Sequence, residues 1–232
     1  MRSLAALLLF LLTASAAAPR EKIFMIPGFD RVRIDGPFEV VIAQGTTRAS
    51  AVGDERQLER LDIRVDGNIL VVSAGPEGWR VDAGAPVAAA KVTLRTPALR
   101  AIVVNGGGVA RIEAMRGTRV DLGLNGAGGI QVGAVTADDL GVTLIGSGGI
   151  ILGGTARSAR MRTSGAGSID GAALIANDAV LVNESAGSLV LGVRYSVQVN
   201  ALGLGMVRIL GTPECTIRGA GPVQCDGRVV RR

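Results

Sequence analysis

A glycine triplet that returns about every 20 residues constrains the fold of this chain more than any other feature. Seven G-x-G triplets, one with serine in the first place, follow one another from residue 106 to residue 221. Their last glycines stand 20, 20, 19, 20, 18 and 16 residues apart, at Gly108, Gly128, Gly148, Gly167, Gly187, Gly205 and Gly221. A fixed period of this length is typical of solenoids, in which each repeat forms one coil of a stack.

The residues around each triplet alternate in the way that strands require. Positions two and four residues after the last glycine are nearly always apolar, as in Ile130 and Val132, and so is the position six residues before it, as in Leu122. The position four residues before it is mixed, because it includes Thr163 and Asn183. A period of two indicates strands. Each repeat is therefore predicted to form a strand, a glycine corner and a second strand, with like residues stacked on like.

Glycine suits such a corner because it reaches positive φ without a Cβ penalty and lets two backbones approach closely. The predicted fold is all-β: a right-handed parallel β-helix, or β-solenoid, with coils of about 20 residues and an N-terminal β-rich cap carrying one short helix. A left-handed coil built from hexapeptides fits the spacing less well.

The segment before the repeats is also β-rich. Asp66-Gly67-Asn68 between two apolar runs predicts a hairpin turn, and Asp54 is placed to cap a short helix that carries Leu58 and Leu61. The predicted organisation is a signal peptide at 1–16, a leader of the mature chain at 17–28, N-terminal coils or a cap at 29–90, a repetitive body at 91–225 and a basic C-terminal tail at 226–232.

The first residues have the layout of a secretory signal peptide. Arg2 precedes the apolar run from Leu4 to Leu12, and Ala14-Ser15-Ala16 provides an A-x-A cleavage site. An uncleaved N-terminal anchor is the alternative. No later stretch approaches the ~18 apolar residues that a transmembrane helix needs. We therefore expect an exported protein of the periplasm or the cell surface.

The two cysteines, Cys215 and Cys225, are expected to form a disulfide, because exported chains meet oxidising conditions. They are symmetric about Ala220 at the last corner, and a hairpin closure of the last coil would place them opposite each other. If that coil stays open, the facing sheets would lie ~10 Å apart, and two reduced cysteines would fill apolar columns instead.

Four segments, in this order, resemble one known family. They are the strand pair in 29–40, Gly53-Asp54-Glu55 before a short helix, Asp66 to Leu70, and Thr96-Pro97-Ala98-Leu99 followed by the glycine corners. The resemblance is to the bacterial auto-transporter adhesin head domain, the GIN domain family, and covers roughly residues 28 to 225. It implies a secreted or envelope-associated β-helix without an established enzymatic activity.

Charge is divided unevenly along the chain. Residues 17–90 hold 9 Lys+Arg and 11 Asp+Glu, whereas residues 91–232 hold 15 and 9. The basic half could favour anionic surfaces such as lipopolysaccharide or acidic glycans, although a scattered, solvated arginine surface is the simpler interpretation. Nucleic acid is not expected as a partner, because Tyr195 is the only aromatic residue after Lys91 to stack on a base.

Composition removes most catalytic chemistry. The chain has no histidine, which excludes Ser-His-Asp and Cys-His catalysis and His-ligated zinc. No glycine segment completes a phosphate-binding loop, and only Asp170 comes close to the aspartate offset of a calcium-binding roll. No cofactor, metal or catalytic residue is therefore predicted.

A carbohydrate-active enzyme is the main alternative, because parallel β-helices include polysaccharide lyases and hydrolases. Glycoside hydrolysis needs two carboxylates that flank one bond, yet adjacent strand residues such as Asp138 and Asp139 point to opposite faces. Trp79 and Tyr195 are too few to line a sugar cleft, and Trp79 could plug the end of the solenoid or anchor a partner. The favoured function is a non-enzymatic, adhesin-like interaction or scaffolding role at the cell envelope, with an envelope glycan or protein as partner.

Overall fold

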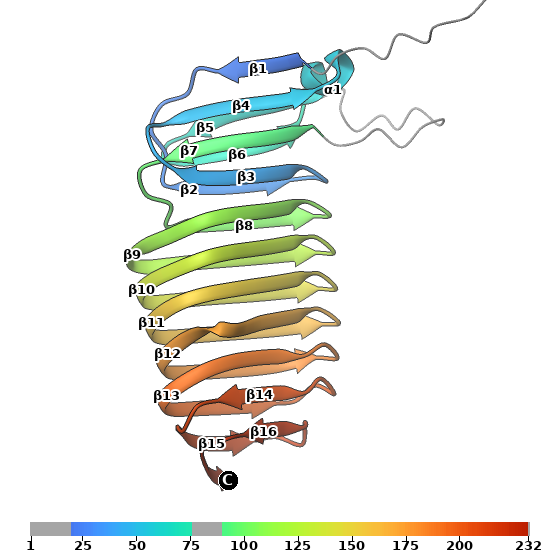
Figure 1. Ribbon diagram of the computed structural model, residues 1–232. Helices are drawn as coiled ribbons and strands as arrows, with labels where there is room; N and C mark the ends of the chain where they lie inside the picture. The colour runs from blue at the N-terminus through green and yellow to red at the C-terminus, as the bar shows by residue number, and fades with distance from the viewer. Residues whose placement is uncertain (1–19, 76–89, 232) are drawn as a thin grey trace, which may run out of the picture.

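The computed structural model describes residues 20–75 and 90–231 and shows the β-solenoid that the repeat predicts (Figure 1). Its coils stack in one column, with the cap at the N-terminal end. The predicted signal peptide, Trp79 and most of the predicted loop before the body lie outside the described residues.

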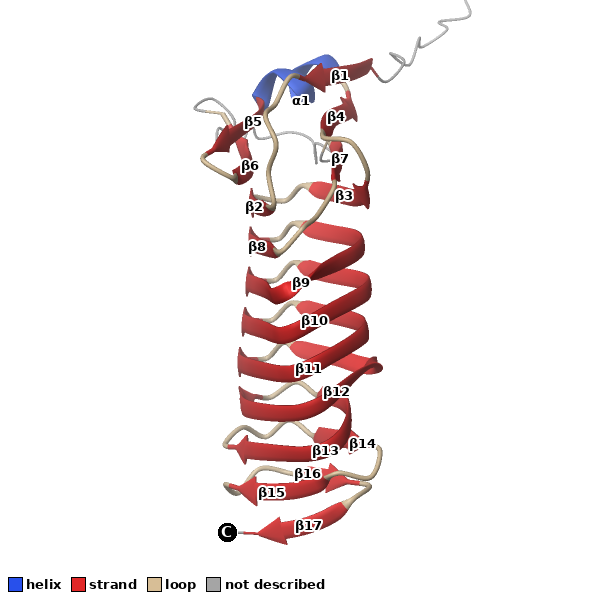
Figure 2. Cartoon of the chain, turned by 90° about the vertical axis from the view of Figure 1, so that its left-hand side faces the viewer, coloured by secondary structure: helices blue, strands red, loops and turns tan. Residues whose placement is uncertain are grey.

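One short strand, β8 (Ala101–Gly106), and a series of long bent strands form the central coils. The long strands are β9 (Val109–Gly126), β10 (Gly129–Gly146), β11 (Gly149–Gly165), β12 (Ser168–Ser185) and β13 (Leu189–Ala201). From β9 to β13 each strand wraps from one side of the column to the other (Figure 2). Its first segment belongs to one sheet, here sheet A, and its second segment to the opposite sheet, sheet B. Neighbouring coils pair in parallel and in register, as Ile130 with Ile150 in sheet A and Val142 with Met161 in sheet B.

Shorter strands continue both sheets to the C-terminal end. β14 (Val207–Leu210) and β16 (Val223–Cys225) extend sheet A, and β15 (Glu214–Arg218) and β17 (Arg228–Arg231) extend sheet B. Residues 226–232 were expected as a tail, but most of them form β17, because its backbone can pair in parallel with β15.

The N-terminal end combines one coil with antiparallel strands. Its elements are β1 (Arg20–Phe24), β2 (Arg31–Asp35), β3 (Glu39–Gln44), β4 (Arg48–Gly53), α1 (Glu55–Arg60), β5 (Leu61–Asp66), β6 (Ile69–Ala74) and β7 (Lys91–Thr96). β2 and β3 pair in parallel with β8 and β9 and so form a coil of the same stack. β1 with β4, β4 with β7 and β5 with β6 pair antiparallel. These turned-back strands cover an end that would otherwise expose open strand edges.

The short helix and the hairpin lie where the sequence predicts them. Asp54 is the N-cap of α1, and its carboxylate accepts a hydrogen bond from the Gln57 amide while the Gln57 side chain accepts one from the Asp54 amide. Leu58 and Leu61 are buried inside the cap. β5 and β6 are joined at Gly67, whose φ of 61° lies in the left-handed region that glycine adopts without strain.

One continuous apolar core fills the space between the two sheets. The columns predicted to face inward do so, since Ile102, Leu122, Val142, Met161 and Leu181 are all at most 3% exposed. The last coil departs from the predicted columns, because its corner is shorter.

In the last coil, Cys215 pairs with Val197 rather than with Val199, and Ile217 pairs with Val199. A shift of two residues keeps both side chains facing inward, because side chains alternate with a period of two. Both residues accordingly remain buried.

The mixed column also lies inside the core. Thr163 and Asn183 are fully buried, and the Thr163 hydroxyl donates to the Asn183 side-chain oxygen at 2.6 Å. The Asn183 side-chain nitrogen donates to the Gly205 carbonyl at 3.0 Å. Because both groups find partners, the interior tolerates polar side chains there.

Two glycines of a corner are needed for different reasons. Gly126, the first glycine of its triplet, has a φ of 130°, which a residue with a Cβ rarely adopts. A Cβ on Gly128, the last glycine, would overlap the Gly108 carbonyl oxygen in the coil above. The same overlap with the preceding coil's backbone applies to Gly108, Gly148, Gly167, Gly187, Gly205 and Gly221. Close stacking therefore requires glycine at all seven predicted corner positions.

Candidate functional site

A groove on the outer face of sheet B is the candidate site. It crosses β8 to β12 along the axis of the column and has a volume of about 470 Å³. We call it the sheet-B groove and define it by the outward-facing residues Ala101, Val103, Arg119, Asp121, Gly123, Asp139, Gly141, Thr143, Arg160, Arg162, Val180 and Val182.

Register explains why the surface is hollow there. In-register stacking aligns Val103, Gly123, Thr143, Arg162 and Val182 in one outward column. Gly123 has no side chain, so the column is low at β9 and rises again at the long Arg162 side chain in β11. The neighbouring outward column is likewise low at its glycine and high at its arginine.

In that second column Gly141 of β10 lies between Asp121 of β9 and Arg160 of β11. Gly123 and Gly141 lie diagonally across from each other on neighbouring strands, because Gly141 pairs with Asp121 and Gly123 with Thr143, and together they make the floor of the groove. Outward glycines away from the corner triplets are the sequence signal for this groove, but the period of the corners does not single them out.

Paired charges frame the apolar floor. The Arg119 guanidinium donates to the Asp121 carboxylate at 2.9 and 3.0 Å, and Arg162 donates to Glu184 at 2.8 Å. The hydrogen bond and charge of Asp121, together with the charge of Asp139, raise the pKa of Arg119 above its ordinary value. Exposed pairs of this kind stabilise a fold little. They do place charges of both signs beside the floor and, through Arg160 and Arg162 of β11, across the groove.

The structure separates the two carboxylates of the enzymatic alternative. Asp138 lies 3.1 Å from the Arg157 guanidinium and Asp139 lies 3.5 Å from that of Arg160. Asp139 lines the sheet-B groove, whereas Asp138 does not. Each carboxylate thus has its own arginine partner, and only Asp139 lines the groove.

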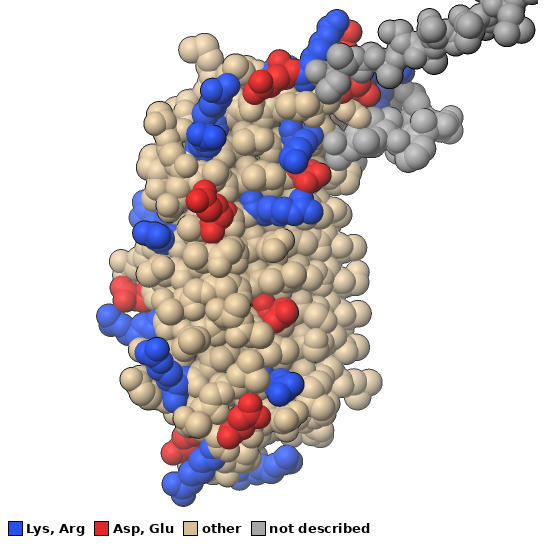
Figure 3. Space-filling view, in the orientation of Figure 1, with Lys and Arg blue, Asp and Glu red and all other residues tan. Residues whose placement is uncertain are grey.

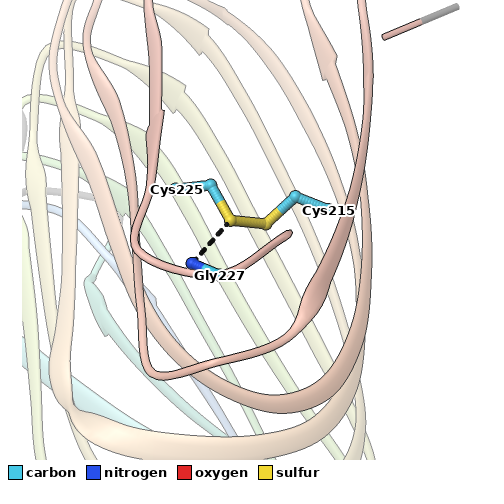
Figure 4. Close-up of a disulfide and its surroundings, with 3 residues drawn as sticks. All are labelled: Cys215, Cys225 and Gly227. Carbon is cyan, nitrogen blue, oxygen red and sulfur yellow. Dashed lines mark hydrogen bonds between the residues drawn. A yellow bond between two sulfur atoms is a disulfide. The ribbon is translucent and has the colours of Figure 1, made fainter. Parts of the chain in front are cut away.

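Cys215 and Cys225 form the predicted disulfide, but not by the predicted route (Figure 4). Their Cα atoms lie 6.7 Å apart, and the Cys225 Sγ accepts a hydrogen bond from the Gly227 amide at 3.3 Å. A hairpin closure was expected, yet β15 pairs with β13 and β17 while β16 pairs with β14. The bond thus crosses the inside of an open coil. Their Cα separation is smaller than the ~10 Å spacing of packed sheets, and the two cysteines lie near the strand ends where the chain passes from one sheet to the other.

Tyr195 does not line the groove. Tyr195 follows the bend of β13 and is 63% exposed. Among residues 20–75 and 90–231, no cluster of three or more His, Cys, Asp or Glu side chains could hold a metal ion. Over the same residues, no helix is long and apolar enough to cross a membrane.

Comparison with known families decides the classification. Residues 28–213 match the family described as "Putative auto-transporter adhesin, head GIN domain". The chain belongs to this GIN domain family. A search of curated proteins finds no match.

Solved structures share the fold of this GIN domain. A putative adhesin from Bacteroides fragilis superposes with a TM-score of 0.82 at 20% identity, covering 90% of this chain and 98% of that one. A putative adhesin from Parabacteroides merdae gives 0.70 at 18% identity, with coverage of 92% and 97%. A putative lipid binding protein from Parabacteroides distasonis gives 0.69 at 18% identity, with coverage of 93% and 97%. At these identities the likeness shows the fold alone.

Proposed function

We propose that this GIN domain is an exported, non-enzymatic binding module that holds an extended segment of a partner protein in the sheet-B groove at the cell envelope. The signal-peptide pattern of residues 1–16 and the disulfide support export. Membership of a family described as adhesin heads supports a role in binding.

The observation that carries the proposal is a groove in which small or apolar positions alternate with charged side chains. Gly123 and Gly141 leave a low floor on β9 and β10, and Val180 and Val182 form an apolar patch on β12. Arg160 and Arg162 of β11 lie between these two parts and offer polar contacts. Protein-binding surfaces commonly combine apolar contact area with polar groups in this way. A glycan is less suited to the groove, because the residues that line it include no aromatic ring on which a sugar could stack.

Two matched glycine substitutions test the groove. A Cβ on Gly123 would lie 3.4 Å from Val103, and one on Gly129 would lie 3.7 Å from the Gly149 carbonyl oxygen, so both sites accept a side chain. Gly123→Lys fills the floor of the groove. Gly129→Lys places the same side chain on the outer face of sheet A.

The experiment measures binding of each purified variant to bacterial envelope fractions, before and after protease treatment of the fractions. We expect saturable binding that protease removes, that Gly123→Lys weakens about tenfold or more, and that Gly129→Lys leaves unchanged. Equal binding by the two variants, or binding that survives the protease, would contradict the proposal. Turnover of a polysaccharide that Asp139→Asn abolishes would favour the enzymatic alternative instead.

A further inference from the structure

The corner between β13 and β14 carries three exposed apolar side chains. Leu202 is 59%, Leu204 87% and Met206 46% exposed. The tips of the other triplet corners are small, namely Gly107, Ala127, Ser147, Ala166, Ala186 and Ala220. Leu204 is thus the one large apolar side chain at the tip of a triplet corner.

The backbone of this corner is tied to the coil above it. The Leu202 and Gly203 amides both donate to the Asn183 carbonyl at 2.8 Å, and the Gly205 amide donates to Ser185 at 2.9 Å. The buried Asn183 side chain donates back to the Gly205 carbonyl at 3.0 Å. These bonds hold the three apolar side chains out into solvent, so the corner cannot bury them by folding inward.

Two arginines without ion-pair partners among the described residues lie next to this corner. Arg208 lies two residues after Met206 in β14, and Arg218 pairs with Asn200 at the end of β15. Residues 194–231 hold five arginines and two carboxylates. None of these five has a carboxylate within 4 Å among the residues that the structure describes. Figure 3 shows Lys and Arg side chains, together with Asp and Glu, on this lower end of the column.

The central coils differ in this respect. Six of their seven arginines between residues 100 and 193 lie within 4 Å of a carboxylate, and these are Arg100, Arg111, Arg119, Arg157, Arg160 and Arg162. Positive charge that is neutralised in the body therefore remains available at the C-terminal end, next to the apolar corner.

We propose that this corner is a wedge that docks the C-terminal end of the solenoid on a bilayer rich in anionic lipid. Leu204, with Leu202 and Met206, would enter the boundary between headgroups and acyl chains, where apolar side chains gain by leaving water. Arg208 and Arg218 would contact the lipid phosphates, and basic groups close to an anionic leaflet strengthen binding. A protruding tip suits a bilayer better than a folded partner, which would need a matching pocket.

Vesicle sedimentation tests the wedge without reference to the sheet-B groove. The chain is purified from an exporting host, and its intact mass is measured so that every sample has the same N-terminus. The vesicles contain either phosphatidylcholine alone or equal parts of phosphatidylcholine and phosphatidylglycerol. We expect binding to the anionic vesicles that weakens as salt is added, because salt screens the arginines.

The variants distinguish binding through the wedge from nonspecific adsorption of the protein to the vesicles. Leu204→Ser should weaken binding about tenfold, and Arg208→Gln with Arg218→Gln should weaken it by a similar factor. The controls are Ile175→Ser, an exposed apolar site in the middle of β12, and Arg111→Gln with Arg157→Gln, two arginines that already have partners. The controls should bind like the unchanged chain.

Three outcomes would overturn the proposal. They are no binding to anionic vesicles, binding that the Leu204 and arginine variants leave intact, and losses of equal size in the control variants. Failure of the sheet-B groove would not produce any of them, since protein-free vesicles offer no polypeptide to that groove.

Discussion

The central coils of this solenoid are held by long strands that pair with neighbouring coils, whereas the last coils have short strands and a disulfide. β9 to β12 are strands of 17 or 18 residues that pair with a coil on each side. β14 to β17 have only three to five residues, and β16 and β17 pair on one side alone within the described chain. Backbone pairing therefore contributes less to the last coils.

A covalent bond replaces part of that pairing. Cys215 and Cys225 join sheets A and B near the C-terminal end of the column. The central coils need no such bond, because each is held by the coils above and below it. The two regions also present different surfaces, since neutralised arginines frame the sheet-B groove in the body whereas unpartnered arginines flank an apolar corner at the end.

The largest expected effect comes from a charge inside the central stack. Ile150 is 1% exposed and stacks on Ile130, so Ile150→Asp should lower the free energy of unfolding by about 4 kcal/mol or more. Ser147→Asp, at the exposed tip of the same corner, should change it by less than about 0.5 kcal/mol. Denaturant unfolding of both variants is the measurement, and losses of equal size would show that the inward face is assigned incorrectly.

A methyl group at a corner is the next largest perturbation. In Gly148→Ala the new Cβ would overlap the Gly128 carbonyl oxygen and lie 2.8 Å from a Leu124 methyl group, which should cost about 3 kcal/mol. Its neighbour Gly149 has no atom within 4 Å of an added Cβ, and Gly149→Ala should be nearly neutral. Similar melting temperatures for the two variants would contradict the close stacking of coils.

Removal of the disulfide should have a smaller and more local effect. Cys215→Ala with Cys225→Ala opens a ring whose cysteines are 10 residues apart, which by loop-closure entropy costs about 2–3 kcal/mol. Hydrogen exchange should become faster in β15 to β17 and remain unchanged in β10 and β11. Faster exchange in the central strands would mean that the disulfide stabilises the whole column rather than its C-terminal end.

The repeat made the fold predictable because each coil has to match its neighbour. Seven glycines at nearly equal spacing and three apolar columns were sufficient to place the corners and the inward faces. Asp54 and Gly67 marked the helix and the hairpin of the cap through local backbone preferences. The disulfide followed from the number of cysteines and the expected export, whereas its path across an open coil depends on the pairing of β15 and β16 with different strands, which spacing does not report.

The candidate surfaces were harder to predict because they arise between coils. The floor of the sheet-B groove forms where outward glycines of neighbouring strands, Gly123 and Gly141, come to lie diagonally across from each other. Whether an arginine is neutralised depends on which carboxylate the register brings next to it, as with Arg160 and Asp139. The two-residue shift of the last coil likewise needs the register of β15.

The most direct test of this division of surfaces is a crossed binding experiment. Gly123→Lys and Leu204→Ser are each assayed on protein-bearing envelope fractions at high salt and on protein-free anionic vesicles at low salt. The account predicts that Gly123→Lys loses binding only to the protein-bearing fractions and that Leu204→Ser loses binding only to the vesicles. A variant that lost both to the same extent would contradict the assignment of separate partners to the central and last coils.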